Sequence, residues 1–161
     1  MAIQTQNPAT GKVIKTFEAY SDAKVDDAIE SSLAAHKILR DWSFERRAEA
    51  MLKAADILED EADRLGEIMT LEMGKTLKGA KAEAKKCAWV CRHYAETAED
   101  YLADEMIESD ASKSYKKYLP LGPVLAVMPW NYPFWQVMRF AAPALMAGNT
   151  GLLKHASNVP Q

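Results

Sequence analysis

The pattern of apolar and polar positions divides the chain into a helical part and a later part that contains strands. Apolar residues recur at helical spacing in three segments, which predicts amphipathic helices over residues 22–39, 43–74 and 76–103. Ser21, Ser43 and Thr76 stand where N-caps belong, and Gly74 stands where a C-terminal cap belongs. Before these helices, residues 3–20 contain a turn signature from Asn7 to Gly11, which predicts an edge hairpin.

The pattern changes after residue 111. Residues 112–119 alternate polar and aromatic side chains and are typical of a strand, and the apolar run 124–128 indicates a strand buried on both faces. A helix over 134–146, with an apolar face formed by Val137, Phe140, Ala141, Ala144 and Leu145, leads to a second strand over 150–154. Strand, helix and strand joined by short loops predict a parallel βαβ unit. The expected fold class is therefore α/β, a helical N-terminal layer plus the first βαβ of a doubly wound, Rossmann-like parallel sheet. Because one unit cannot cover both faces of a sheet, we expect the sheet to be incomplete.

Composition narrows the classes of function. The 161 residues are 48% hydrophobic, enough for one domain with a sizeable core. The 20 basic and 23 acidic residues are mixed along the helices, which argues against a nucleic-acid partner. The first residues do not resemble a secretory signal, and the longest apolar stretch, 140–148, is too short to cross a membrane. Two cysteines at helical spacing form no disulfide framework and no histidine has metal-ligand spacing, so we expect a cytoplasmic protein without a metal.

The candidate chemistry follows the two predicted strands. In open α/β sheets, ligands lie beyond the carboxyl ends of the strands, where Asn131 and Lys154 stand in this sequence. The usual glycine-rich phosphate turn is absent between Met128 and Phe134, and a bulky turn with two prolines takes its place. Other roles are open to each residue: Asn131 as a turn residue that caps the next helix, Lys154 as a solvated strand-end lysine, and Ser157 as an N-cap.

Five segments together carry a resemblance to a known family. In order and spacing, the chain resembles the aldehyde dehydrogenase superfamily, and within it the NADP-accepting succinate-semialdehyde dehydrogenases, at residues 7–11, 72–76, 129–133, 143–149 and 153–154. The resemblance covers the whole chain but only about the N-terminal third of a full-length member. It implies that residues 1–161 are the N-terminal part of the cofactor-binding domain, without the catalytic domain, and that 112–119 is an oligomerisation strand.

The resemblance also implies roles for individual residues. Members oxidise an aldehyde through a cysteine thiohemiacetal, pass hydride to NAD(P), and hydrolyse the thioester with a glutamate base. Neither that cysteine nor that glutamate is matched here, so we expect this fragment to be inactive alone. Asn131 matches the asparagine that donates to the developing oxyanion. The cofactor would lie against the end of the first strand and the turn that follows it, and against the end of the second strand and the segment beyond, namely Val127, Met128, Pro129, Trp130, Lys154 and Ser157. Ser157 stands where many NAD-preferring members carry a glutamate, which implies NADP as cofactor with NAD possible.

The substrate interpretation depends on the predicted helix over 134–146. Trp135 and Arg139 lie four residues apart and would line a pocket together. Arg139 matches the arginine that binds the substrate carboxylate, which implies oxidation of succinic semialdehyde to succinate by a homo-oligomeric enzyme. A surface salt-bridging role is open to Arg139, and the substrate could be another aldehyde. A non-catalytic truncated remnant is the alternative of a different class.

Overall fold

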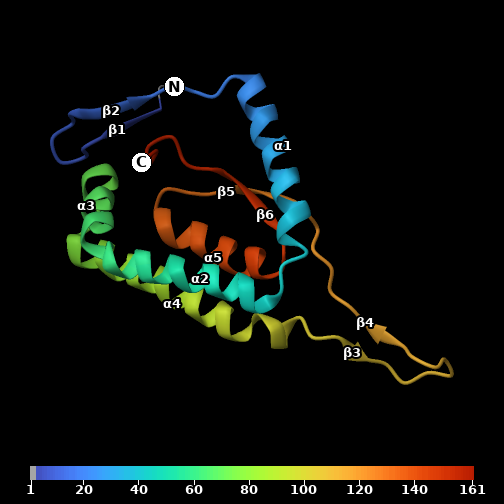
Figure 1. Cartoon of the computed structure of the whole chain (residues 1–161). Coiled ribbons are helices and arrows are strands. Elements are labelled where there is room, and N and C mark those ends of the chain that lie inside the picture. The colour runs from blue at the N-terminus through green and yellow to red at the C-terminus, as the bar shows by residue number, and fades with distance from the viewer. Residues whose placement is uncertain (1–2) are drawn as a thin grey trace.

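A computed structural model describes residues 3–161 and has the mixed α/β architecture that the sequence predicts (Figure 1). The N-terminal hairpin consists of β1 (Ile3–Gln6) and β2 (Val13–Phe17). The helices that follow are α1 (Asp22–Leu39), α2 (Phe44–Asp60), α3 (Ala62–Met73) and α4 (Leu77–Tyr101). The rest of the described chain forms β3 (Glu105–Met106), β4 (Tyr115–Lys116), β5 (Pro123–Val127), α5 (Pro133–Met146) and β6 (Thr150–Lys154).

The predicted helix caps are confirmed. The Ser21, Ser43 and Thr76 hydroxyls each accept a hydrogen bond from a first-turn backbone N–H at 3.3 Å. Gly74 ends α3 with φ +75°, a left-handed conformation that glycine adopts without a side-chain clash. The three connections are therefore fixed by local chemistry.

The helical region predicted over 43–74 is divided in two at Glu61. Its φ of −93° and ψ of 11° leave the helical range. The division has a packing reason, because the two helices bury their apolar faces in different clusters. In α2, Met51 and Ala55 pack with the second half of α4 and with α5. In α3, Leu65 and Met69 pack against the first half of α4.

The βαβ unit is confirmed, with β5 and β6 parallel and α5 between them in sequence. In Figure 1, α5 lies between this strand pair and the α2–α4 pair, while α1 runs alongside β6. The fully buried residues of α5 are Ala142 and Met146, which face α2 and α4. The predicted apolar face is therefore only partly the core face: Leu145 of that face packs on this cluster, and so do Trp135 and Met138, which lie outside it. Apolar residues surround α5 because it packs on two sides, and Phe140 contacts β6 at Gly151.

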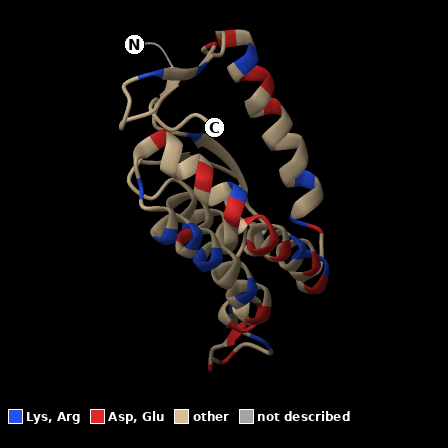
Figure 2. Ribbon diagram, turned by 90° about the vertical axis from the view of Figure 1, so that its left-hand side faces the viewer, with Lys and Arg blue, Asp and Glu red and all other residues tan. Residues whose placement is uncertain are grey.

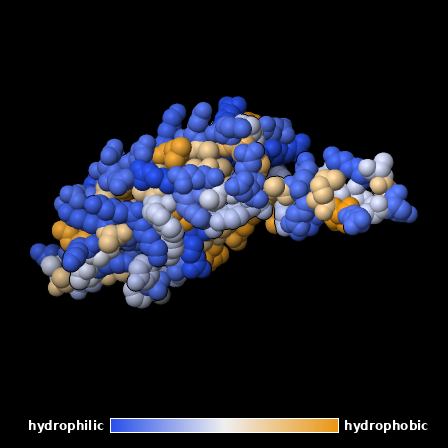
Figure 3. Space-filling view, turned by 90° about the horizontal axis from the view of Figure 1, so that it is seen from below, coloured by the Kyte–Doolittle hydropathy of each residue, from blue (hydrophilic) through white to orange (hydrophobic). Residues whose placement is uncertain are grey.

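Two strand predictions were wrong in detail. The prediction that β5 is buried on both faces fails, because Leu125 and Val127 are each 65% exposed while Ala126 between them is buried. The two-stranded sheet has only one covered face at these positions. The strand predicted over 112–119 shortens to Tyr115–Lys116, which pairs antiparallel with β3 in an arm that projects from the body (Figures 1 and 3).

The surface carries both charge signs. Figure 2 shows acidic and basic residues interspersed along the helices. Within residues 3–161, none of the helices has both the length and the apolar character that crossing a bilayer requires. The same part of the chain contains no cluster of three or more His, Cys, Asp or Glu side chains suited to a metal ion.

Candidate active site

The carboxyl ends of β5 and β6 meet at one edge of the strand pair. Val127 lies opposite Lys154, and the Met128 N–H donates to the Lys154 carbonyl at 3.0 Å. The turn from Met128 to Tyr132 and the turn that contains Ser157 both start from this edge. The structure therefore brings the predicted turn residues and Lys154 to neighbouring strand ends.

Asn131 lies exposed on the turn that leads into α5. It is not the cap of that helix, because Tyr132 occupies the N-cap position and Pro133 the first helical position. The alternative role of Asn131 as a helix cap is therefore wrong. The Asn131 amide makes no hydrogen bond to any residue from 3 to 161, so its donors are available at the surface of the turn.

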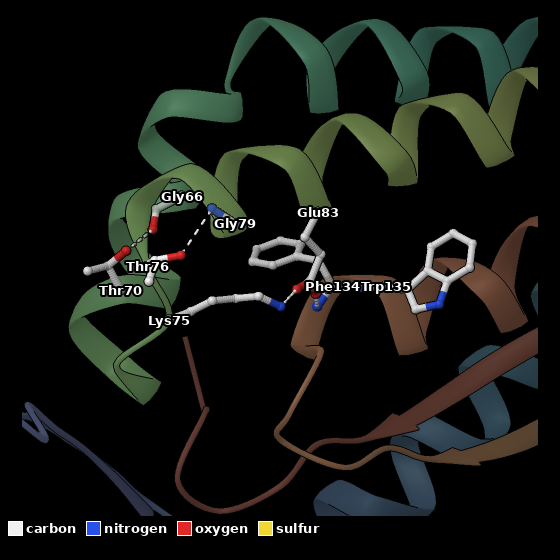
Figure 4. A network of polar contacts seen from close by, with 8 residues as sticks. All are labelled: Gly66, Thr70, Lys75, Thr76, Gly79, Glu83, Phe134 and Trp135. Carbon is white, nitrogen blue, oxygen red and sulfur yellow. Dashed lines mark hydrogen bonds and ion pairs between the residues drawn. The ribbon is translucent and has the colours of Figure 1, made fainter.

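A carboxylate from α4 caps α5 instead. One Glu83 carboxylate oxygen, Oε1, accepts hydrogen bonds from the backbone N–H groups of Phe134 at 3.0 Å and Trp135 at 2.9 Å. The other oxygen, Oε2, forms an ion pair with Lys75 (Figure 4). The Lys75 ammonium also lies 3.6 Å from the centre of the Tyr132 ring, a cation–π distance. Side chains from α4 and from the α3–α4 connection thus contact both sides of the α5 start.

One cavity, of about 590 Å³, brings together two of the predicted cofactor residues. Trp130 and Ser157 line it with parts of the N-terminal hairpin and with Glu72. The buried Glu72 carboxylate accepts hydrogen bonds from the Thr5 hydroxyl at 2.7 Å and the Gln161 N–H at 3.0 Å. Lys154 is exposed. Among residues 3–161, no carboxylate lies within 4.0 Å of its ammonium, the distance limit of an ion pair. A free ammonium and a hydroxyl after β6 suit a phosphorylated ribose, so these residues fit NADP.

A second cavity, of about 540 Å³, contains the predicted substrate arginine. Arg139 lines it with Met128, Gln136 and Phe140. Trp135 does not line this cavity. Its ring packs against the helical core and lies 3.9 Å from the Lys86 ammonium. A pocket shared by Trp135 and Arg139 stays a prediction.

The two cysteines are buried in the helical core. Burial, with the nearby Glu83 carboxylate as a second cause, raises the pKa of the Cys87 thiol to about 12. Burial raises the pKa of Cys91 to about 11. Both side chains are fully buried and uncharged at neutral pH, so neither can act as a nucleophilic thiolate.

Comparison with known proteins identifies the family. The model of the aldehyde dehydrogenase family matches residues 1–161. The chain belongs to this family. Over 161 residues it is 57% identical to a probable NADP(+) succinate-semialdehyde dehydrogenase of Synechocystis, covering all of this chain and 36% of that protein. It is 58% identical over 164 residues to succinate-semialdehyde dehydrogenase [NADP(+)] 1 of Mycobacterium tuberculosis, again covering 36% of the relative.

Solved structures of the family agree with the fold. The succinic semialdehyde dehydrogenase of Streptococcus pyogenes, determined in complex with NADP+, superimposes with a TM-score of 0.94 at 36% identity. The superposition covers 99% of this chain and 35% of that enzyme. The chain therefore spans about a third of the length of the relatives that it matches.

The predictions missed Glu83 and the role of Lys75, although the sequence contains a signal for Glu83. Glu83 stands within the apolar stripe of its helix, between Ala80 and Cys87, where a charged side chain needs partners. Tyr132 occupies the N-cap position before Pro133, and its side chain does not cap the helix. The N–H groups in the first turn of α5 therefore need an acceptor from another segment. Gln136 was missed because nothing in its spacing distinguishes it from an exposed helix residue.

Proposed function

We propose that this chain supplies the oxyanion donor, the NADP contacts and the carboxylate-binding arginine of an NADP-dependent succinate-semialdehyde dehydrogenase. The observation that carries the proposal is that the carboxyl ends of β5 and β6 lie side by side, with Lys154 at the end of β6 and with Asn131 and Ser157 in the segments that follow the two strands. Identity of 57–58% to enzymes with this printed name, over the whole chain, supports it.

Lys154 and Ser157 are the proposed contacts for the cofactor ribose. The ammonium pairs with a 2′-phosphate, and the hydroxyl donates a hydrogen bond to it. Trp130 lies in the same cavity as Ser157, and Val127, Met128 and Pro129 form the strand end and turn beside it. NADP, when bound, accepts the hydride that leaves the substrate.

Asn131 is the proposed oxyanion donor. Its side-chain N–H groups are exposed at the turn and donate to the oxygen that becomes negative as a nucleophile adds to the aldehyde. A donor of this kind contributes about 3–4 kcal/mol to transition-state stabilisation. The reaction needs a thiolate, which neither Cys87 nor Cys91 can provide, so the nucleophile of the proposed enzyme lies outside these 161 residues.

Arg139 is the proposed ligand of the substrate carboxylate. Arg139 lines a cavity with Met128, which directly precedes the cofactor-side residue Pro129, so a substrate there would extend toward the turn. Trp135 stays a predicted substrate residue, and its position in the helical core gives it an indirect role through packing of α5.

Steady-state kinetics of the complete enzyme test the substrate class. Replacing Arg139 by alanine should raise the KM for succinic semialdehyde at least about tenfold, the loss expected for a charged hydrogen bond. The KM for an uncharged aldehyde of similar length should stay unchanged and serves as the control. If the KM values for both aldehydes change together, or neither changes, the carboxylate assignment fails.

The proposed enzyme is a cytoplasmic homo-oligomer. Two free cysteines suit a reducing compartment. The β3–β4 arm, which contains residues of the predicted oligomerisation strand, projects from the body (Figure 3). Met106 and Leu119, in and beside this arm, have exposed apolar side chains. Equilibrium sedimentation of the complete protein with and without this arm tests the assembly role.

A further inference from the structure

The start of α5 has no cap within its own segment. Tyr132 at the N-cap position makes no side-chain hydrogen bond to the helix. The first N–H groups of any α-helix lack an acceptor in the preceding turn, and Pro133 removes only one of them. Phe134 and Trp135 therefore need an acceptor from another element.

Glu83 is that acceptor. Its carboxylate accepts from both N–H groups at 2.9 and 3.0 Å, and its side chain is only 2% exposed. A buried carboxylate is costly unless hydrogen bonds and a counter-charge surround it. A negative charge at a helix N-terminus is also favoured by the helix dipole. The contact therefore fixes the start of α5 relative to α4.

Lys75 completes the arrangement from the α3–α4 connection. It pairs with the second Glu83 oxygen, and its side chain is 15% exposed. Gly74 in the left-handed conformation and the cap residue Thr76 hold its backbone on either side. The same ammonium lies against the Tyr132 ring. Lys75 therefore contacts the turn directly and also acts on the start of α5 through Glu83, the contact drawn in Figure 4.

We propose that Glu83 and Lys75 are positioning residues for Asn131, an inference that rests on the proposed oxyanion role of Asn131. The Asn131 amide has no hydrogen bond to the described residues, so its direction follows the backbone of the turn. Glu83 binds the backbone N–H groups of Phe134 and Trp135, and Lys75 lies against the Tyr132 ring, directly after Asn131. Misplacing a catalytic group by about 1 Å can cost about a hundredfold in rate.

The first test uses Glu83→Gln in the complete enzyme. The neutral side chain cannot form the ion pair and accepts the two N–H groups less strongly. We expect kcat to fall about tenfold or more with the KM for the aldehyde within about twofold, because the oxyanion forms only in the transition state. Hydrogen exchange at the Phe134 and Trp135 amides, followed by mass spectrometry, should become faster.

A double-mutant cycle separates positioning from a general structural role. If Glu83 acts through Asn131, then Glu83→Gln should lower kcat less than about twofold in an enzyme that already carries Asn131→Ala. If the loss of kcat in the double variant equals the product of the losses in the two single variants, the inference is overturned. Unchanged exchange at the two amides also overturns it, whatever the activity.

Lys75 gives a second test that does not depend on the Glu83 variant folding. Lys75→Met should lower kcat in the same way, and Lys75→Arg should restore most of it because the charge returns. Lys81→Met is the matched control, since Lys81 pairs with Asp63 at 2.9 Å and has no polar contact with α5 among residues 3–161. Equal losses in the Lys75→Met and Lys81→Met enzymes overturn the inference. A wild-type enzyme without aldehyde oxidation overturns the proposed function instead, and the exchange measurement still reports whether Glu83 holds the turn.

Discussion

Arg47 holds the carboxyl end of α5, and replacing it with methionine should loosen that end selectively. Its Nη1 donates to the Met146 carbonyl at 2.9 Å, and its Nη2 donates to the Arg40 carbonyl at 3.1 Å. Burial lowers the pKa of Arg47, although the group stays charged at neutral pH. A cation at this position also complements the negative end of the helix dipole.

The magnitude follows from these contacts. The part-buried bond to Met146 involves a charged donor and contributes about 1.5–3 kcal/mol, while the exposed bond to Arg40 contributes about 0.5 kcal/mol. Arg47 Nε is buried without a partner among residues 3–161, and its removal offsets part of the loss. Methionine keeps most of the apolar stem. The expected net cost for opening α5 is therefore about 2 kcal/mol.

Hydrogen exchange across α5 measures this cost directly. A change of about 2 kcal/mol corresponds to roughly thirty-fold faster exchange where exchange reports the opening equilibrium. Arg46→Met is the control, because the neighbouring Arg46 guanidinium stacks on Trp42 and has no hydrogen bond to α5. If Arg47→Met and Arg46→Met change exchange in α5 by the same factor, the assigned role of Arg47 is refuted.

The remaining predictions concern the cofactor and the thiols. Ser157→Glu in the complete enzyme should lower the NADP-to-NAD ratio of kcat/KM at least about tenfold, because a carboxylate repels the 2′-phosphate. Ser157→Gln, which has the size of glutamate without its charge, should change this ratio less. An unaltered ratio for Ser157→Glu would contradict the proposed contact between Ser157 and the cofactor. Cys87 and Cys91 should resist alkylation at pH 8 until the protein unfolds, and rapid labelling of the native protein would contradict their burial. Burial raises the pKa of Cys87 to about 12 and that of Cys91 to about 11, above the ordinary thiol pKa of 9.0. The thiols therefore ionise first in the unfolded chain, and the free energy of unfolding falls as the pH rises above about 9. Replacing both by alanine should remove that part of the pH dependence of the unfolding free energy.

The sequence predicted the elements whose signals are local. Ser43 and Thr76 cap helices through their own hydroxyls, and the strands around α5 are bounded by proline and glycine. The division at Glu61 could not be predicted because the apolar period continues through it. That helix boundary depends on which part of α4 each segment meets, and this is a property of the packed chain.

In the site, too, features that follow from local sequence were predicted and long-range contacts were missed. Lys154 ends one strand and Asn131 follows the other, so the parallel topology alone places them at one edge. The partner of α5 at its first turn, Glu83, is separated from Phe134 by 51 positions. Trp135 packs on the helical core and Arg139 lines a cavity, because α5 has packed neighbours on two sides. A prediction that assumes a single apolar stripe cannot distinguish these two environments. Residues that act across long sequence separations were therefore the ones missed.

The attachment of α5 at both ends by charged side chains from other helices has a consequence for how the enzyme can change during evolution. Glu83 fixes the end that follows Asn131, and Arg47 fixes the opposite end, so neither attachment uses the cavity-lining side chains Gln136 and Arg139. In the proposed enzyme, mutations at those two positions would alter which aldehyde is accepted without altering the backbone that carries Asn131. Substrate preference could then change while the proposed oxyanion donor keeps its place.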